Sequence, residues 1–177
     1  MSGVSKCPEE LLDWWKGQLN PKGRYIYGYS HQLRKFGDYD FDQIAYVLEG
    51  LKNNPNSRRL IITTWNSDDM ANITNTNDNP QTPTCCHGTM LQFFARDGML
   101  YMKHYQRSAD LLLGVPHNFV QYWALLLYFC YHSGLKPGWI RWDFGDAHIY
   151  DEESHIKAAQ EIISAIATKH NCKLVYT

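Results

Sequence analysis

A hairpin signal near the middle of the chain constrains the fold more than any other feature of the sequence. Residues 87–96 and 99–107 favour two β-strands, and Asp97-Gly98 between them is a pair typical of tight antiparallel turns. The most apolar stretch, residues 119–131, follows closely and is too short to span a bilayer. Because this stretch is apolar on all sides, it predicts a helix buried in the core.

The remaining pattern predicts helices packed on a β-sheet. We expect helices at 8–17, from about 41 to 53, from about 117 to 133, and at 152–170. Further strands are expected at 60–65, 139–144 and 173–176, with a long polar loop at 68–84. No repeat or linker interrupts the chain, so the sequence predicts one α+β domain over residues 1–177.

Composition restricts the partners and the compartment. Hydrophobic residues make up 44% and charged residues 20%, which is typical of a globular chain. A formal charge of −1 argues against binding to a nucleic-acid duplex, although local basic residues can bind a single phosphate. Five cysteines, two of them adjacent, and no secretory signal indicate a reducing, cytoplasmic location.

Three chemically distinct side chains lie close together in the sequence: Cys86, Arg107 and Asn118. A thiol becomes a nucleophile when a nearby cation favours the thiolate, and Arg107 supplies that charge if the two central strands pair. The alternatives are that Cys85 and Cys86 are simply buried, or that they bind a metal ion with His87 and His104. No paired CxxC spacing supports a metal site.

Several ordered motifs give the chain a strong resemblance to the thymidylate synthase family. They cover about 124 of the 177 residues, from Tyr27 to Tyr150. The motifs are Tyr27-Gly28, Asn54-Pro55-Asn56-Ser57-Arg58-Arg59, Trp65-Asn66, Cys86-His87, Tyr105-Gln106-Arg107-Ser108-Ala109-Asp110, Leu113-Gly114-Val115-Pro116-His117-Asn118 and Gly145-Asp146-Ala147-His148-Ile149-Tyr150.

The resemblance implies a one-carbon transfer to a pyrimidine nucleotide without a metal ion. The Cys86 thiolate would add to C6 of dUMP, and C5 would take a one-carbon unit from 5,10-methylenetetrahydrofolate. Asn118 would read the uracil edge, since a carboxamide offers an acceptor to N3–H and a donor to O4. Cytosine-using relatives carry Asp at that position. Without the resemblance, Asn118 would be interpreted as a helix N-cap.

The resemblance also assigns the other site residues. Arg107, which also lowers the Cys86 pKa, and Ser108 would bind the phosphate, and Arg58-Arg59 would reach the partner's phosphate in a homodimer. The implied catalytic residues are Cys86, Glu10, Arg107 and Asp110, of which Asp110 would also contact the folate. The implied substrate-binding residues are Arg58, Arg59, Arg107, Ser108, Ala109, Asp110, Gly114, Asn118, His148 and Tyr150, the last two through the sugar hydroxyl.

Each of these assignments has a structural alternative. Adjacent arginines are usually a solvated surface, and an Asp after a strand is most often a turn former. Without the resemblance, a His and a Tyr on one strand face, here His148 and Tyr150, would more often be a core edge. Glu10 would assist proton transfer near C4, or would simply be the acidic N-terminus of a helix.

The chain also departs from the family pattern. Only 26 residues precede Tyr27 and 27 follow Tyr150, so an N-terminal phosphate arginine and a C-terminal closing segment have no clear counterparts. Closure over the site excludes water, and water would give a hydroxymethyl instead of a methyl product. The primary interpretation is methylation of dUMP to dTMP. The alternatives are a hydroxymethyltransferase acting on dUMP or dCMP, and a non-catalytic nucleotide-binding subunit.

Overall fold

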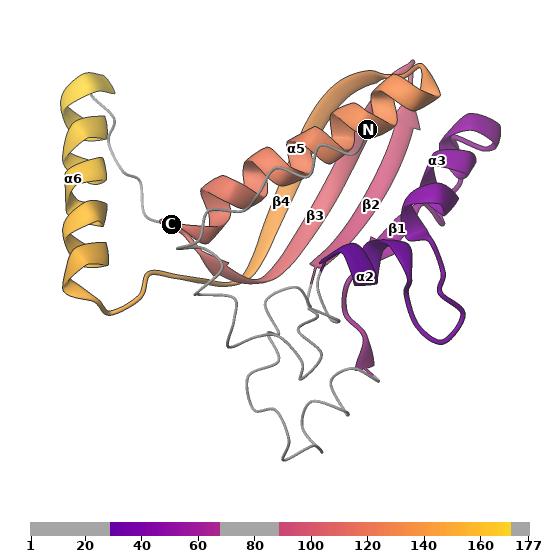
Figure 1. Cartoon of the computed structure of the whole chain (residues 1–177). Coiled ribbons are helices and arrows are strands. Elements are labelled where there is room, and N and C mark those ends of the chain that lie inside the picture. The colour runs from indigo at the N-terminus through magenta and orange to yellow at the C-terminus, as the bar shows by residue number, and fades with distance from the viewer. Residues whose placement is uncertain (1–28, 68–88, 171–177) are drawn as a thin grey trace, which may run out of the picture.

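A four-stranded mixed sheet forms the centre of the computed structural model, which describes residues 29–67 and 89–170 (Figure 1). The strands lie in the order β1-β2-β3-β4, with α5 across one face and α6 standing away from the sheet. The architecture is α+β, as the sequence predicted. The elements are α2 (Tyr29–Arg34), α3 (Gln43–Asn53), β1 (Ile61–Thr63), β2 (Thr89–Arg96), β3 (Met99–Asp110), α5 (Gly114–Ser133), β4 (Lys136–His148) and α6 (Glu153–His170).

The predicted hairpin is confirmed. Asp97 and Gly98 both have positive φ, 51° and 75°, which is the backbone of a type I′ turn. The turn fixes an antiparallel register from Arg96↔Met99 to Thr89↔Gln106. After α5 the chain returns as β4, which pairs parallel with β3 up to Asp110↔His148. A parallel pair needs such a crossover, and the apolar helix provides it.

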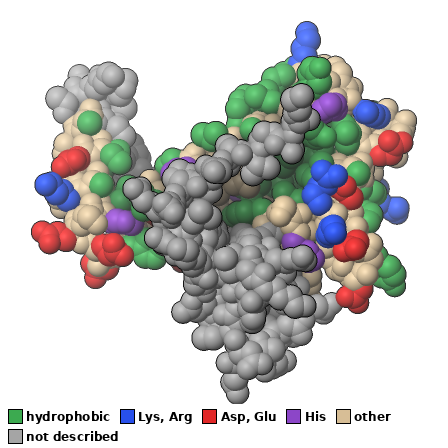
Figure 2. All heavy atoms as spheres, in the orientation of Figure 1, with side chains coloured by type: hydrophobic (Ala, Val, Ile, Leu, Met, Phe, Trp, Pro, Cys, Tyr) green, Lys and Arg blue, Asp and Glu red, His purple; other side chains and the backbone are tan. Residues whose placement is uncertain are grey.

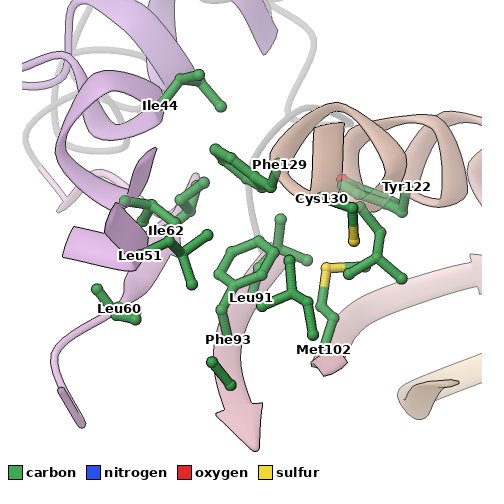
Figure 3. Packing of buried hydrophobic residues seen from close by; sticks show 14 residues of the cluster. Ile44, Leu51, Leu60, Ile62, Leu91, Phe93, Met102, Tyr122, Phe129 and Cys130 are labelled. Atoms are coloured by element: carbon green, nitrogen blue, oxygen red, sulfur yellow. The ribbon is translucent and has the colours of Figure 1, made fainter. Parts of the chain in front are cut away.

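The core lies between the sheet and two helices, α3 and α5 (Figure 3). Phe93 of β2 and Phe129 of α5 meet edge to face with ring centroids 5.0 Å apart, and both side chains are fully buried. Ile62 of β1 and Leu51 of α3 close the same cluster from the other side. Within the described residues, no helix covers the opposite face of the sheet.

Hydrogen bonds of the buried Gln43 side chain join α2, α3 and β1. The sequence did not predict α2. Gln43, at the start of α3, donates to the carbonyl oxygens of Gln32 and Thr63 at 2.7 Å each, and it accepts from the Thr63 N–H at 2.9 Å. Asp42 caps α3 by accepting from the Ala45 N–H. Burial opposes ionisation of Asp42, but this bond and the Arg34 guanidinium outweigh it and lower its pKa.

Most predicted elements are present with shifted ends. Helix α3 ends at Asn53 as expected, and α6 covers nearly the predicted range. Helix α5 ends as predicted at left-handed Gly134 (φ 76°) but starts at Gly114, three residues early. Strand β1 is shorter than predicted, whereas β4 is longer. The helix at 8–17, the loop at 68–84 and the strand at 173–176 lie outside the described residues.

The prediction that the apolar helix is buried on all sides is wrong. Leu126 and Phe129 of α5 are fully buried against the sheet, but Val120 is 72% and Tyr131 83% exposed. Hydrophobic side chains consequently gather on the surface over α5 in Figure 2. Among the described residues, no helix is long and apolar enough to cross a membrane.

His104 of β3 is buried with neither ring nitrogen hydrogen-bonded, within the part of the chain that the structure describes. Its ring packs on Tyr122, with centroids 4.2 Å apart, and on Trp142, at 4.0 Å. Burial disfavours the imidazolium and lowers the pKa of His104 from 6.5 to about 3. The folded state therefore holds His104 neutral, whereas the unfolded chain protonates it below pH 6.5.

We predict that His104 makes the fold acid-sensitive. Because its folded pKa is depressed, its contribution to stability is complete above pH 6.5 and is lost progressively as the pH falls toward 3. Between pH 7 and pH 5 the wild-type protein should lose roughly 2 kcal/mol more unfolding free energy than His104→Leu loses. Urea unfolding at both pH values measures this loss. The control His132→Leu, at an exposed position, should keep the wild-type loss, and an equal loss in both variants would contradict the prediction.

Candidate active site

One end of the sheet collects most of the predicted site residues that the structure describes. The parallel register places Ser108 opposite Asp146 and Asp110 opposite His148 where β3 and β4 end. The chain then turns through residues 111–113 into α5, whose second turn carries Asn118. Motifs far apart in the sequence therefore meet in one place.

Asn118 lies inside α5, so its interpretation as an N-cap is wrong. The capping position is Leu113, which makes no side-chain capping bond. The half-buried Asn118 carboxamide instead accepts a hydrogen bond at its Oδ1 from Gln106 Nε2, at 3.0 Å. It is thus oriented toward β3, where a helix-capping residue would not point.

Asp110 does the structural work that its alternative interpretation predicted. Its Oδ1 accepts from the backbone N–H groups of Leu112 and Leu113, and its Oδ2 accepts from that of Gly114. The bonds from Leu113 and Gly114 satisfy two of the N–H groups that a helix start leaves without partners, in place of a Leu113 side-chain cap, and the bond from Leu112 fixes the turn before the helix. Asp110 thereby fixes the start of α5 and the height of Asn118 above the sheet. Its neighbour Ala109 is fully buried.

Arg107 and Ser108 are exposed at the same end of β3. The Arg107 guanidinium carbon lies 5.9 Å from the ring centroid of Trp65, which is a cation–π distance. Gly145 of β4 permits the close approach of β3 there: a Cβ at this position would lie 2.7 Å from the Arg107 carbonyl oxygen and 2.6 Å from Tyr105 Oη. An exposed guanidinium and a hydroxyl beside it suit a phosphate group.

His148 is the last residue of β4, and Tyr150 follows two positions later with its ring centroid 5.2 Å from that of His148. Asp146 Oδ2 lies 3.3 Å from His148 Nδ1, but the contact lacks hydrogen-bond geometry, so within the described residues this buried nitrogen has no hydrogen-bond partner. His148 belongs to the strand, whereas Tyr150 lies beyond it and is half exposed. Neither residue belongs to the hydrophobic core cluster of the described residues.

Arg58 and Arg59 lie at the other end of the sheet. Ile61 of β1 pairs with Gln92 of β2, and Gln92 pairs with Lys103 of β3. Arg59, two positions before Ile61, is therefore level with about residue 101 of β3. Six strand residues, about 20 Å, then separate it from the level of Arg107. Both arginines are exposed, and Arg59 lines a groove of about 850 Å³ beside α3. Within one chain, the structure does not bring them to the other site residues.

Two of the predicted catalytic residues, Cys86 and Glu10, lie outside the described residues, as do Cys85 and His87. Of the five cysteines, Cys130 is described: it is buried in the core, and burial raises the pKa of its thiol. A thiol with a raised pKa is a poor nucleophile. Among the described residues, no cluster of three or more His, Cys, Asp and Glu side chains could hold a metal ion.

Sequence reasoning missed two residues of this site, Gln106 and Trp142. Gln106 connects Trp142 Nε1, which donates to its Oε1 at 3.1 Å, with Asn118 and the Ser108 carbonyl oxygen. Gln106 stands within one of the recognised motifs, next to Arg107, and that was the available signal. Nothing in the sequence indicates which side chains meet Trp142.

These features define a two-layer α+β protein with a candidate nucleotide-binding site at the end of its sheet. A family model described as thymidylate synthase matches residues 3–176. A thymidylate synthase of Corynebacterium aurimucosum is 35% identical over 166 residues, which are 92% of this chain and 58% of that relative. The chain belongs to the thymidylate synthase family, and it spans somewhat more than half the length of that relative.

Proposed function

We propose that the protein methylates dUMP to dTMP with 5,10-methylenetetrahydrofolate, through a covalent bond to Cys86. One observation carries the proposal: the β3–β4 register and α5 bring Ser108, His148 and Asn118, from three separate motifs, to one end of the sheet. Membership of the thymidylate synthase family supports the same chemistry.

The described residues would bind and orient the nucleotide. Arg107 and Ser108 would hold its phosphate, the His148–Tyr150 pair its sugar hydroxyl, and the Asn118 carboxamide its pyrimidine edge. Cys86 stands three positions before Thr89, whose backbone pairs with Gln106, the residue that contacts Asn118. Three residues span at most about 11 Å, so the length of chain between Cys86 and Thr89 would allow the thiol to reach a base held by Asn118. Glu10 would move the proton near C4.

The described residues fit a reduced folate beside the nucleotide. Trp65 presents a half-exposed indole ring on which a flat pterin can stack. Among the described residues, Asp110 accepts three backbone bonds, which leaves one of the roughly four lone-pair sites of a carboxylate for an N–H group of a pterin. The folate would supply the one-carbon unit and the hydride that reduces it to a methyl group.

A homodimer would complete the site. The sheet face opposite α5 carries half-exposed apolar side chains on all four strands, among them Met90, Tyr105 and Trp139. An apolar sheet face is normally covered, and a second copy packed on it would form a two-fold interface. Such packing would let Arg58 and Arg59, distant from Arg107 in one chain, reach the partner's phosphate site.

We predict a covalent adduct at Cys86 and a methyl product. Incubation with 5-fluoro-dUMP and methylenetetrahydrofolate should add the mass of both ligands to the wild-type protein. The Cys86→Ser variant should keep its unmodified mass. The matched control Cys130→Ser should still form the adduct, since Cys130 lies in the core.

Mass spectrometry of the product formed from dUMP should identify dTMP. Release of 5-hydroxymethyl-dUMP would instead show that the protein is a hydroxymethyltransferase. A wild-type protein that binds dUMP without forming an adduct would be a non-catalytic nucleotide-binding subunit.

Asn118→Asp should shift the preference from dUMP toward dCMP. A protonated or water-bridged carboxyl group matches the cytosine edge better than a carboxamide does, so the ratio of kcat/KM for dUMP to that for dCMP should fall at least about 100-fold. Steady-state kinetics with both nucleotides measures the ratio. An unchanged ratio would mean that Asn118 does not contact the base.

Subunit mixing should reveal the shared site. Cys86→Ser and the double variant Arg58→Ala/Arg59→Ala should each be inactive, yet their mixture, exchanged in mild denaturant, should regain about a quarter of wild-type activity. Half of randomly paired dimers are hybrids, and each hybrid has one intact site. Mixing Cys86→Ser with Asn118→Asp is the control, because both changes fall in the same subunit's site. Equal recovery with dUMP in both mixtures, or none in either, would oppose the arginine assignment.

A further inference from the structure

We propose that Trp142 and Gln106 are positioning residues that set the direction of the Asn118 carboxamide and thereby select uracil over cytosine. This inference rests on the proposed function, in which Asn118 reads the base. It names two residues of β4 and β3 that would determine specificity without touching the nucleotide.

The orientation of the Gln106 amide is fixed by two partners that cannot exchange roles. Trp142 Nε1 donates to Gln106 Oε1 at 3.1 Å, and an indole N–H can only donate. Gln106 Nε2 donates to the Ser108 carbonyl oxygen at 2.9 Å, and a backbone carbonyl can only accept. Reversing the amide would oppose two donors at Trp142 and two acceptors at Ser108. The oxygen of Gln106 must therefore face Trp142, and its nitrogen must face away.

This orientation determines that of Asn118. Gln106 Nε2 lies 3.0 Å from Asn118 Oδ1, so Asn118 presents its oxygen to β3 and keeps its Nδ2 on the other side. A carbonyl oxygen has two lone pairs and can accept a second bond from a ring N–H while Nδ2 donates to a neighbouring carbonyl. That pattern matches uracil. Cytosine requires the reversed carboxamide, which would place the two NH₂ groups of Asn118 and Gln106 against each other.

Packing holds the first member of this chain in place. The Trp142 ring contacts His104 and Phe119 with centroids 4.0 and 4.4 Å apart, each edge to face, and the tryptophan packs against the core. An indole confined in this way loses little freedom when it donates to Gln106. The hydrogen-bond direction is therefore set in the core and transmitted through Gln106 to the site.

Trp142→Phe tests the inference because it keeps an aromatic ring and removes the indole N–H, the only hydrogen-bond donor of a tryptophan side chain. The measured quantity is the ratio of kcat/KM for dUMP to that for dCMP, which does not depend on the fraction of active protein. The ratio should fall roughly 10-fold, with a higher KM for dUMP and a smaller change in kcat. Trp123→Phe, an exposed position of α5, is the matched control and should keep the wild-type ratio. A change below threefold in Trp142→Phe would overturn the inference.

Gln106→Glu provides a second test with nearly the same side-chain shape. A carboxylate still accepts from Trp142 but cannot donate to Asn118, so Asn118 should turn its Nδ2 toward β3 and present the cytosine-matching pattern. The ratio should fall further than in Trp142→Phe, and a wild-type ratio would contradict the proposal.

Equilibrium binding separates this inference from the proposed function. Calorimetry with dUMP and dCMP on the same proteins gives a ratio of Kd values that needs no turnover. A wild-type protein that binds dUMP without converting it would refute methyl transfer, and the Kd ratios would then decide the role of Trp142. A wild-type protein that binds neither nucleotide would refute both proposals.

Discussion

The pairing of β3 with β4 is the interaction on which the rest of the structure depends. It is parallel, so its two strands end together, and the side chains at both ends become neighbours although 38 positions separate Asp110 from His148. Two glycines of β4 permit the pairing: a Cβ at Gly138 would lie 2.8 Å from the Leu100 carbonyl oxygen, and one at Gly145 would lie 2.7 Å from that of Arg107. Larger residues at these positions would separate the strands and, with them, the two halves of the candidate site.

Local signals in the sequence were sufficient for the elements whose ends are set by backbone chemistry. Asp97-Gly98 and Gly134 adopt the positive φ values that their residue types favour, so the hairpin turn and the end of α5 were predictable. The start of α5 was not, because its cap comes from Asp110, four residues before the helix and still on β3. Helix α2 was missed because its one buried residue, Gln32, is polar.

The error over α5 has a different origin. A run of apolar residues shows that a helix must pack against other elements, but it does not show how many faces of the helix those elements bury in the described structure. Here the sheet covers the side with Leu126 and Phe129, and Val120 and Tyr131 point elsewhere. Prediction of the candidate site from sequence has the same limit. The motifs name Asn118 and Arg107 as candidate site residues, but their contacts depend on strand register, which the motifs do not give.

The direction of an amide is the clearest case of information that only the fold holds. Asn and Gln carry a donor and an acceptor of nearly equal size, so the residue type alone leaves the direction open. It becomes defined where a group with a fixed role lies next to it, here the Trp142 indole and the Ser108 carbonyl. Since Ser108 is itself a candidate phosphate contact on β3, the strand that would hold one end of the nucleotide would also set how its other end is read. Under the proposed function, specificity at Asn118 would then be a property of the β3–β4 pair and not of the asparagine alone.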